Sequence, residues 1–209
     1  MMRSIAIAMT AALIAASPAF AAAECCAPGW KELFNGEDLE GWKNARPGES
    51  LRWFVEDGTL TNNPDDKDIA TTESFQDFDL MLEYKTVPKG NSGVYLRGRI
   101  EIQVLDSYGR TEIGTGDDGG IYGQHAPLVN ASRPPGEWSR LEVTFVGDTL
   151  TAKLNGKLIH DNVKITEVTG GALPGGVKDP GPLMLQGDHG KVWYRNIFIR
   201  PITAAAETQ

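Results

Sequence analysis

A polar stretch between residues 91 and 106 carries the side chains best suited to chemistry in this sequence. It reads as two strands joined by a Gly-centred turn, and successive strand residues point to opposite faces. One face is apolar and comprises Val94, Leu96, Ile100, Ile102 and Val104. The other face comprises Tyr95, Arg97, Glu101 and Gln103, with Asp106 just beyond. Because an aromatic ring, a guanidinium, a carboxylate and an amide gather there, this face is predicted to form the floor of a sugar-binding cleft.

The length of the turn decides whether that polar face exists. A two-residue turn at Gly98-Arg99 would place Leu96 opposite Glu101, whereas a three-residue turn at 97–99 pairs Leu96 with Ile100. A one-residue slip moves every side chain to the other face, so only the three-residue turn keeps apolar residues opposite apolar residues. Such loops require a residue at positive φ, which Gly98 can supply. We therefore expect Tyr95 to lie opposite Glu101.

The elements that would carry this hairpin follow the pattern of an all-β sandwich or barrel. Gly, Pro, Asn and Asp recur at short intervals between brief apolar runs, and helical periodicity is nearly absent. Asn155-Gly156 is the preferred pair for a two-residue hairpin turn. Strands are expected at 53–55, 59–61, 78–86, 93–97, 100–105, 138–146, 149–154, 157–160, 182–186 and 192–200. Long loops are expected at 62–69, 108–135 and 163–180, and loops of this length usually shape a ligand site.

The N-terminus has the pattern of a secretion signal over residues 1–23. Arg3 supplies the basic region, an apolar run follows, and small residues permit cleavage after Ala21 or Ala23. The apolar run is too short to span a membrane. The mature chain is therefore expected to be exported, to the periplasm in a Gram-negative host. Residues 28–202 are expected to form one domain, followed by a disordered tail at 203–209.

Charge and cysteine content narrow the classes of partner. The formal net charge of −8 argues against binding to nucleic acid or anionic membranes. The adjacent Cys25 and Cys26 rarely bond to each other without strain, so they read as a thiol pair near the mature N-terminus. The segment Asp117-Asp118-Gly119-Gly120 could bind Ca²⁺ through oxygen ligands. It lacks the further spaced acidic ligands of a dedicated Ca²⁺ loop, so a plain turn is favoured and no cofactor is expected.

Several segments occur in an order that carries a family resemblance. They are Gly29–Trp42, Phe78–Leu80, Gly90–Arg97, Glu101–Asp106, Gly120–Tyr122, Asn130–Trp138, Leu154–Gly156, Gly181–Gly190 and Val192–Ile199. Together these segments resemble the 3-keto-disaccharide hydrolase domain family over about 28–202, and several landmarks in order are more specific than one short motif. The resemblance implies a concanavalin A-like jelly roll of two antiparallel sheets, a carbohydrate ligand, and cleavage of glycosides oxidised at C3. The segment 186–190 departs from many members by an extra Gly, which bears on the placement of His189.

The implied substrate suggests a route through proton abstraction. In a 3-keto sugar the C2 proton is acidic because the carbanion is delocalised into the C3 carbonyl. Its removal permits β-elimination of the C1 oxygen, and water then adds to the enone. The route needs a general base, donors for the enolate oxygen and an acid for the departing oxygen. We expect Glu101 or His189 to serve as the base or the acid.

The remaining candidates would bind the sugar. Arg97 and Gln103 would bind the enolate oxygen or hydroxyls, and Tyr95 and Trp53 would stack on a pyranose ring. Further expected sugar contacts are Asp106, His125 and Gln186.

These residues also have ordinary structural interpretations. Glu101 could be a solvated strand carboxylate paired with an Arg, and Arg97 could be a surface turn residue. His189 could simply pack in its loop, with Asp188 orienting its ring. The alternative function is therefore a non-catalytic carbohydrate-binding module on the same sandwich. A third interpretation is a laminin-G-like protein-binding module.

Overall fold

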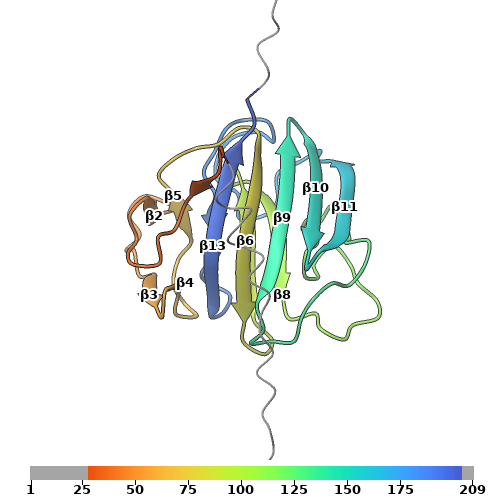
Figure 1. Ribbon diagram of the computed structural model, residues 1–209, viewed down its shortest axis with the longest axis horizontal. Helices are drawn as coiled ribbons and strands as arrows, with labels where there is room; N and C mark the ends of the chain where they lie inside the picture. The colour runs from red at the N-terminus through yellow and green to blue at the C-terminus, as the bar shows by residue number, and fades with distance from the viewer. Residues whose placement is uncertain (1–27, 204–209) are drawn as a thin grey trace, which may run out of the picture.

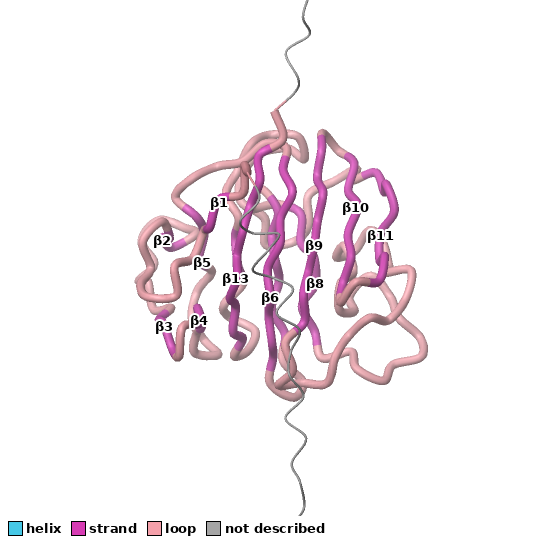
Figure 2. The backbone as a smooth tube through the Cα atoms, in the orientation of Figure 1, coloured by secondary structure: helices cyan, strands magenta, loops and turns pink. Residues whose placement is uncertain are grey.

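The computed structural model describes residues 28–203. The expected secretion signal, Cys25, Cys26 and residues 204–209 of the expected tail lie outside the described residues. The described part of the chain consists of strands and loops, without a helix (Figure 2). It accordingly contains no helix long and apolar enough to cross a bilayer.

The larger of two antiparallel sheets has eight strands. Its strands are β1 (Lys31–Glu32), β3 (Phe54–Glu56), β4 (Thr59–Thr61), β6 (Phe78–Thr86), β9 (Ser139–Val146), β10 (Thr149–Leu154), β11 (Lys157–Lys164) and β13 (Val192–Pro201). They are ordered β11-β10-β9-β6-β13-β4-β3, and β1 pairs with β13. Figure 1 shows the run from β13 through β6, β9 and β10 to β11 side by side.

The smaller sheet has five strands and carries the polar hairpin. Its strands are β2 (Trp42–Asn44), β5 (Ile69–Thr71), β7 (Asn91–Leu96), β8 (Ile100–Leu105) and β12 (Met184–Leu185). Their order is β2-β5-β12-β7-β8. The two sheets enclose one large apolar core, which confirms the predicted all-β jelly-roll sandwich.

The core forms because alternate residues of facing strands are apolar. Leu80 and Leu82 of β6 and Leu141 and Phe145 of β9 are at most 1% exposed. They meet Val94, Leu96, Ile102 and Val104 from β7 and β8, which are equally buried. Since strand side chains alternate, the intervening residues of β7 and β8 face away from the core.

The hairpin between β7 and β8 has the predicted register. Leu96 lies opposite Ile100, and Tyr95 lies opposite Glu101. Gly98 has a φ of 66°, and Arg97 also adopts a positive φ, of 52°. The polar face of this hairpin therefore lies on the outer surface of the five-stranded sheet.

The sequence pattern found most strands but missed three short ones. The Asn155-Gly156 turn has positive φ at both residues, 53° and 78°, as its sequence predicts. Strands β1, β2 and β5 were not predicted, whereas the equally short β3 and β4 were expected at 53–55 and 59–61; two or three residues show too little alternation to identify a strand dependably. Strand β12 is also shorter than the expected 182–186, since only Met184 and Leu185 pair with both neighbouring strands.

Candidate active site

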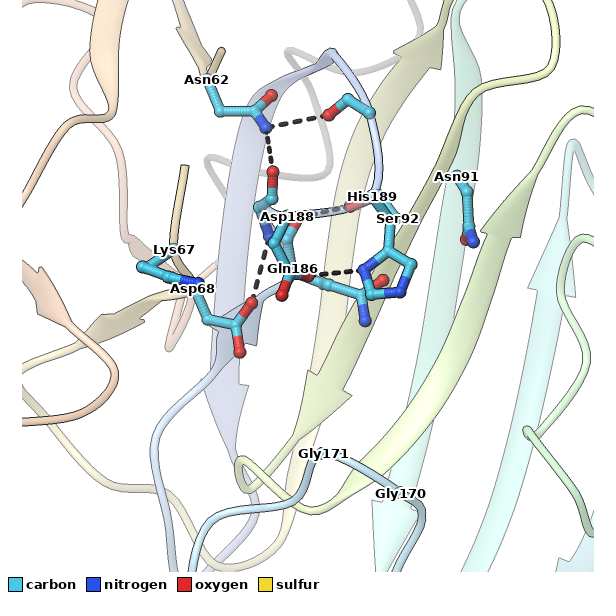
Figure 3. A network of polar contacts seen from close by, with 12 residues as sticks. Asn62, Lys67, Asp68, Asn91, Ser92, Gly170, Gly171, Gln186, Asp188 and His189 are labelled. Carbon is cyan, nitrogen blue, oxygen red and sulfur yellow. Dashed lines mark hydrogen bonds and ion pairs between the residues drawn. The ribbon is translucent and has the colours of Figure 1, made fainter. Parts of the chain in front are cut away.

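A polar cleft of about 290 Å³ lies over the outer face of the five-stranded sheet. Figure 3 shows Gln186, Asp188 and His189 on one segment, and Gly170 and Gly171 on a separate loop beside it. Nine residues line the cleft: Asn91, Tyr95, Glu101, Gln103, Tyr122, Gly170, Gly171, Gln186 and His189. The structure thus brings together five of the residues predicted from the sequence, which are Tyr95, Glu101, Gln103, Gln186 and His189. It adds Asn91 from the start of β7 and Tyr122, Gly170 and Gly171 from the long loops.

Glu101 is the ionisable group at the floor of this cleft. Its side chain is nearly buried, at 4% exposure, and its Oε2 accepts a hydrogen bond of 2.9 Å from the Tyr95 hydroxyl. Burial raises the pKa of Glu101 to about 7, and the Tyr95 hydrogen bond and the charge of His189 oppose this rise. A carboxyl with a pKa near neutrality is suited to take and return a proton at physiological pH.

His189 faces the same cleft from the turn after β12. Its Nδ1 lies 2.5 Å from Asp188 Oδ1, and half of its side chain is exposed. The carboxylate of Asp188 fixes the imidazole ring, as the adjacent positions in the sequence suggested. Because Nδ1 is engaged, Nε2 is the ring nitrogen left to meet a ligand.

Amide side chains supply neutral hydrogen-bonding groups to the cleft. Gln103 Nε2 donates to Asn91 Oδ1 at 2.8 Å, which leaves the Gln103 carbonyl and the Asn91 amide nitrogen for a ligand. The side chain of Gln186 makes no hydrogen bond to any other described residue, while its backbone N–H donates to Gly93. The wall of the cleft therefore offers the Gln103 carbonyl as an acceptor, the Asn91 amide nitrogen as a donor, and the Gln186 amide, which can do either. This set suits sugar hydroxyls.

A charged pair fixes the loops around the cleft. Arg46 donates to Asp68 at 2.6 Å and to the Gly171 carbonyl at 2.5 Å. Asp68 in turn accepts a hydrogen bond from the Gly187 backbone, next to the Asp188–His189 pair (Figure 3). Arg46 and Asp68 thus connect the loop at 170–171 to the turn that carries His189. Nothing in the local sequence pattern pointed to either residue.

Gly93 and Tyr122 were also missed, although the sequence carried a signal for each. A side chain added at Gly93 would come within 2.4 Å of Glu101 Oε1, so the absence of a Cβ makes room for the carboxylate. Glycine inside a strand often marks such a close approach. Tyr122 is 46% exposed and lies in the long loop that was expected to shape the site. It offers the cleft an accessible aromatic ring.

Two of the predicted sugar-binding residues are buried away from the cleft. Arg97 was expected at the rim of the cleft, but it is fully buried, stacks 3.9 Å from the Phe145 ring and donates to Asp77 and three backbone carbonyls. Arg97 itself has a left-handed backbone conformation in the turn, so its side chain does not follow the strand alternation. Trp53 was expected to stack on a sugar, yet it is 3% exposed, packs against Tyr194 and donates to the Lys67 carbonyl.

The structure also changes the role expected for Tyr95 and the placement of two others. Tyr95 is 2% exposed and packs with Ala70 and Met184, so its hydroxyl edges the cleft but its ring face is unavailable to a sugar. Asp106 accepts a hydrogen bond from the Lys89 backbone, and His125 contacts the Lys164 carbonyl. Neither Asp106 nor His125 is among the cleft-lining residues.

The Asp117–Gly120 turn has internal uses for its carboxylates. Asp117 accepts hydrogen bonds from Ser107, Arg110 and the Gly114 backbone. Asp118 accepts from Tyr84 and the Leu105 backbone. Among the described residues, no group of three or more His, Cys, Asp or Glu side chains is arranged to hold a metal ion.

A second hollow, of about 340 Å³, lies on the outer face of the eight-stranded sheet. It is larger than the polar cleft, but both of its carboxylates are paired with arginines. Arg200 binds Asp79, and Arg140 binds Glu142. It also lacks a histidine or a buried ionisable group facing its interior, so we place the candidate site in the polar cleft.

Comparisons with known proteins support a carbohydrate-related role for this fold. A curated 3-keto-disaccharide hydrolase of Bacteroides thetaiotaomicron is 23% identical and aligns over 83% of this chain and 79% of its own length. A crystal structure of a candidate glycosyl hydrolase from Parabacteroides distasonis is 34% identical, covers 84% of both chains and superposes with a TM-score of 0.72. A second such structure from the same species is 24% identical, with a TM-score of 0.70 over 84% of this chain and 95% of that one.

The family profile covers almost all of the described residues. The profile described as the 3-keto-alpha-glucoside-1,2-lyase-like domain matches residues 29–200, which confirms the resemblance found in the sequence. With the relatives above, this match indicates a sugar-processing protein of the glycosyl hydrolase kind. The chain belongs to the 3-keto-alpha-glucoside-1,2-lyase-like domain family.

Proposed function

We propose that this protein cleaves 3-keto-glycosides by removing the C2 proton and eliminating the group at C1. The observation that carries the proposal is a buried carboxyl, Glu101, whose pKa of about 7 suits a general base, in a cleft that also contains an oriented histidine. The family and the curated relative named a 3-keto-disaccharide hydrolase support the choice of substrate.

In this proposal Glu101 and His189 divide the proton transfers. Glu101 takes the C2 proton, and the electron pair of that C–H bond moves into the C3 carbonyl to give an enolate. The enolate then expels the C1 oxygen, which takes a proton from Nε2 of the His189 imidazolium, whose Nδ1–H is held by Asp188. Water adds to the enone at C1 by the reverse transfers, so the net reaction is hydrolysis. The free donors of Asn91 and Gln186 bind the enolate oxygen, and Tyr122 stacks on the ring.

The carboxylate content of the cleft favours elimination over the mechanism of common glycosidases. Those enzymes use two carboxyl groups on either side of the scissile bond. Among the nine residues that line this cleft, Glu101 is the sole carboxylic acid. The cleft is also near the lower end of ligand-pocket volumes, about 300 Å³, which suits a short glycoside better than a polysaccharide chain.

The test is a turnover assay in D₂O with a 3-keto-glycoside and its unoxidised parent. We expect release of the aglycone from the 3-keto compound alone, with deuterium at C2 of the product. The variant Glu101→Gln is expected to lose turnover, and Glu142→Gln, on the opposite sheet, is the matched control. Cleavage of the parent glycoside at an equal rate, or full activity of Glu101→Gln, would overturn the proposal.

A non-catalytic sugar-binding module is the second candidate, because the amides and the exposed Tyr122 could grip a sugar without chemistry. It predicts equal ligand binding by the wild type and by Glu101→Gln, with no turnover by either. We also propose that the protein is exported. N-terminal sequencing of the mature chain would then give a start at Ala22 or Glu24, and an uncleaved chain that begins at Met1 and stays in the cytosolic fraction would contradict it.

A further inference from the structure

The Tyr95 hydroxyl lies between two acceptors but has a single proton to donate. Its oxygen is 2.9 Å from Glu101 Oε2 and 2.9 Å from the Gly170 carbonyl oxygen. Burial raises the pKa of Tyr95, so the phenol keeps its proton throughout the neutral range. One proton serves one of these acceptors at a time, and the other acceptor must find water.

The surroundings of Tyr95 allow that proton to turn while the ring stays in place. The ring is packed against Ala70 and Met184 and is 2% exposed. On the other side, the Gly170 carbonyl oxygen lies 2.9 Å from the hydroxyl, and a Cβ added at Gly171 would come within 3.0 Å of it, so the loop leaves the hydroxyl little room to shift. Rotation about the C–O bond is therefore the freedom that remains to the hydroxyl.

The charge of Glu101 decides which acceptor is the better one. An ionised carboxylate accepts a charge-assisted hydrogen bond, which is stronger than a bond to a neutral carbonyl. When Glu101 takes a proton on Oε1, the oxygen that lies over Gly93, its Oε2 becomes the carbonyl oxygen of a neutral acid. The amide carbonyl of Gly170 is then the better acceptor.

We propose that Tyr95 is a positioning residue whose hydroxyl proton turns from Glu101 to the Gly170 carbonyl when Glu101 becomes protonated. The proposal rests on the proposed function for the role of Glu101 as the base. Proton abstraction from the sugar would then fasten the loop at 169–171 over the cleft while the enolate exists. Return of the proton would release that bond as the product leaves.

Other charged groups face Tyr95 and Glu101, and none of them takes over the role of the Tyr95 hydroxyl proton. Arg46, from the loop after β2, donates to the Gly171 carbonyl through a bond that involves neither Tyr95 nor Glu101, so in this proposal the loop changes by one hydrogen bond rather than detaching. Asp68, from the loop before β5, is paired with Arg46. His189 approaches from the turn after β12 and is paired with Asp188. Thr169 additionally anchors the loop through the Arg99 carbonyl.

The test measures the titration of Glu101 and the loop amides in the intact protein without substrate. In the wild type, we expect hydrogen-exchange protection at Ala172 and Leu173, whose amides bond Thr169 and Gly98, to rise about fivefold as the pH falls through the Glu101 midpoint. The midpoint is read from the ¹³C shift of the Glu101 carboxyl. In Tyr95→Phe, the midpoint is expected to rise by about one pH unit and the pH dependence of protection to vanish.

Tyr84→Phe is the matched control, because it removes another buried phenol–carboxyl bond, to Asp118, away from the cleft. It should leave both the midpoint and the loop protection unchanged. A folded Tyr95→Phe protein with an unshifted midpoint would overturn the proposal. So would wild-type protection that stays constant across the midpoint, a measurement that holds even if the variant fails to fold. Because neither readout uses turnover, an inactive protein would defeat the proposed function and leave this coupling standing.

Discussion

Replacing Gly93 with alanine should separate the geometry of the site from the stability of the fold. Gly93 lies within β7, opposite Gln103, and is not among the residues with positive φ. Alanine can therefore adopt its backbone without strain. The three atoms nearest to the added Cβ all belong to Glu101, at 2.4 Å for Oε1 and 3.0 Å for Cδ and Cγ. The conflict is thus with the end of one side chain and not with the backbone.

The size of the expected effect follows from these distances. Ordinary van der Waals contact begins at 3.4 Å, so the Glu101 carboxylate must move by about 1 Å. A displacement of about 1 Å from the reactive geometry costs on the order of 10²-fold in rate. Stability should change by less than about 1 kcal/mol, because loss of glycine flexibility in the unfolded chain offsets part of the crowding.

The assay compares kcat/KM on a 3-keto-glycoside with the midpoint of urea unfolding. Gly114→Ala is the matched control, since its new Cβ meets no atom closer than 3.9 Å and it lies in a loop. We expect Gly93→Ala to lose about 10²-fold in kcat/KM with an unchanged unfolding midpoint, and Gly114→Ala to keep both. Full activity of Gly93→Ala, in a protein where Glu101→Gln is inactive, would refute the placement of the reactive oxygen over Gly93.

Three further predictions concern pH, ligand contact and the buried arginine. Because the folded pKa of Glu101 is raised from 4.5 to about 7, the contribution of Glu101 to stability should be fully present below pH 4.5 and be lost, by about 3 kcal/mol, as the pH rises through 7. The free energy of unfolding of Glu101→Gln, measured in urea at pH 4.5, 6 and 8, should fall with pH by that much less than the wild-type value. The same pH dependence in both proteins would contradict the raised pKa. Tyr122→Ala should raise KM about fivefold with little change in kcat if its ring stacks on the sugar, and initial-rate kinetics would show it. Arg97→Met should destabilise the fold by about 3–5 kcal/mol, because Asp77 loses its buried partner. The folded fraction of Arg97→Met should have the KM of the wild type. A raised KM with unchanged stability would indicate instead that Arg97 contacts the substrate in the cleft.

The floor of the site could be predicted because it depends on local sequence. The pairing of Tyr95 with Glu101 follows from turn length and from the alternation of apolar residues over a dozen positions. That logic fails at the turn itself. Arg97 is one residue past the last regular pair, its backbone is left-handed, and its side chain turns towards Asp77 and Phe145 instead of the polar face.

The rest of the site depends on contacts between distant segments, which no local pattern encodes. Gly170 reaches Tyr95 across 75 residues, and Arg46 reaches Gly171 across 125. These contacts cover the Tyr95 ring, which is why a residue expected to stack on a sugar instead holds the carboxyl beside it. A face assignment states which side of a sheet a residue occupies, but the loops decide whether that side is open.

Glu101 shows how the two levels combine. Burying a carboxyl disfavours its charged form and lowers the stability of the fold above neutral pH. The same burial brings its pKa to where a base can both take and return a proton. The strand register sets the position of Glu101, Gly93 makes room for one oxygen, and Tyr95 binds the other. A mutation that relieves the burial should therefore stabilise the protein at pH 8 and weaken catalysis together, because one physical property underlies both effects.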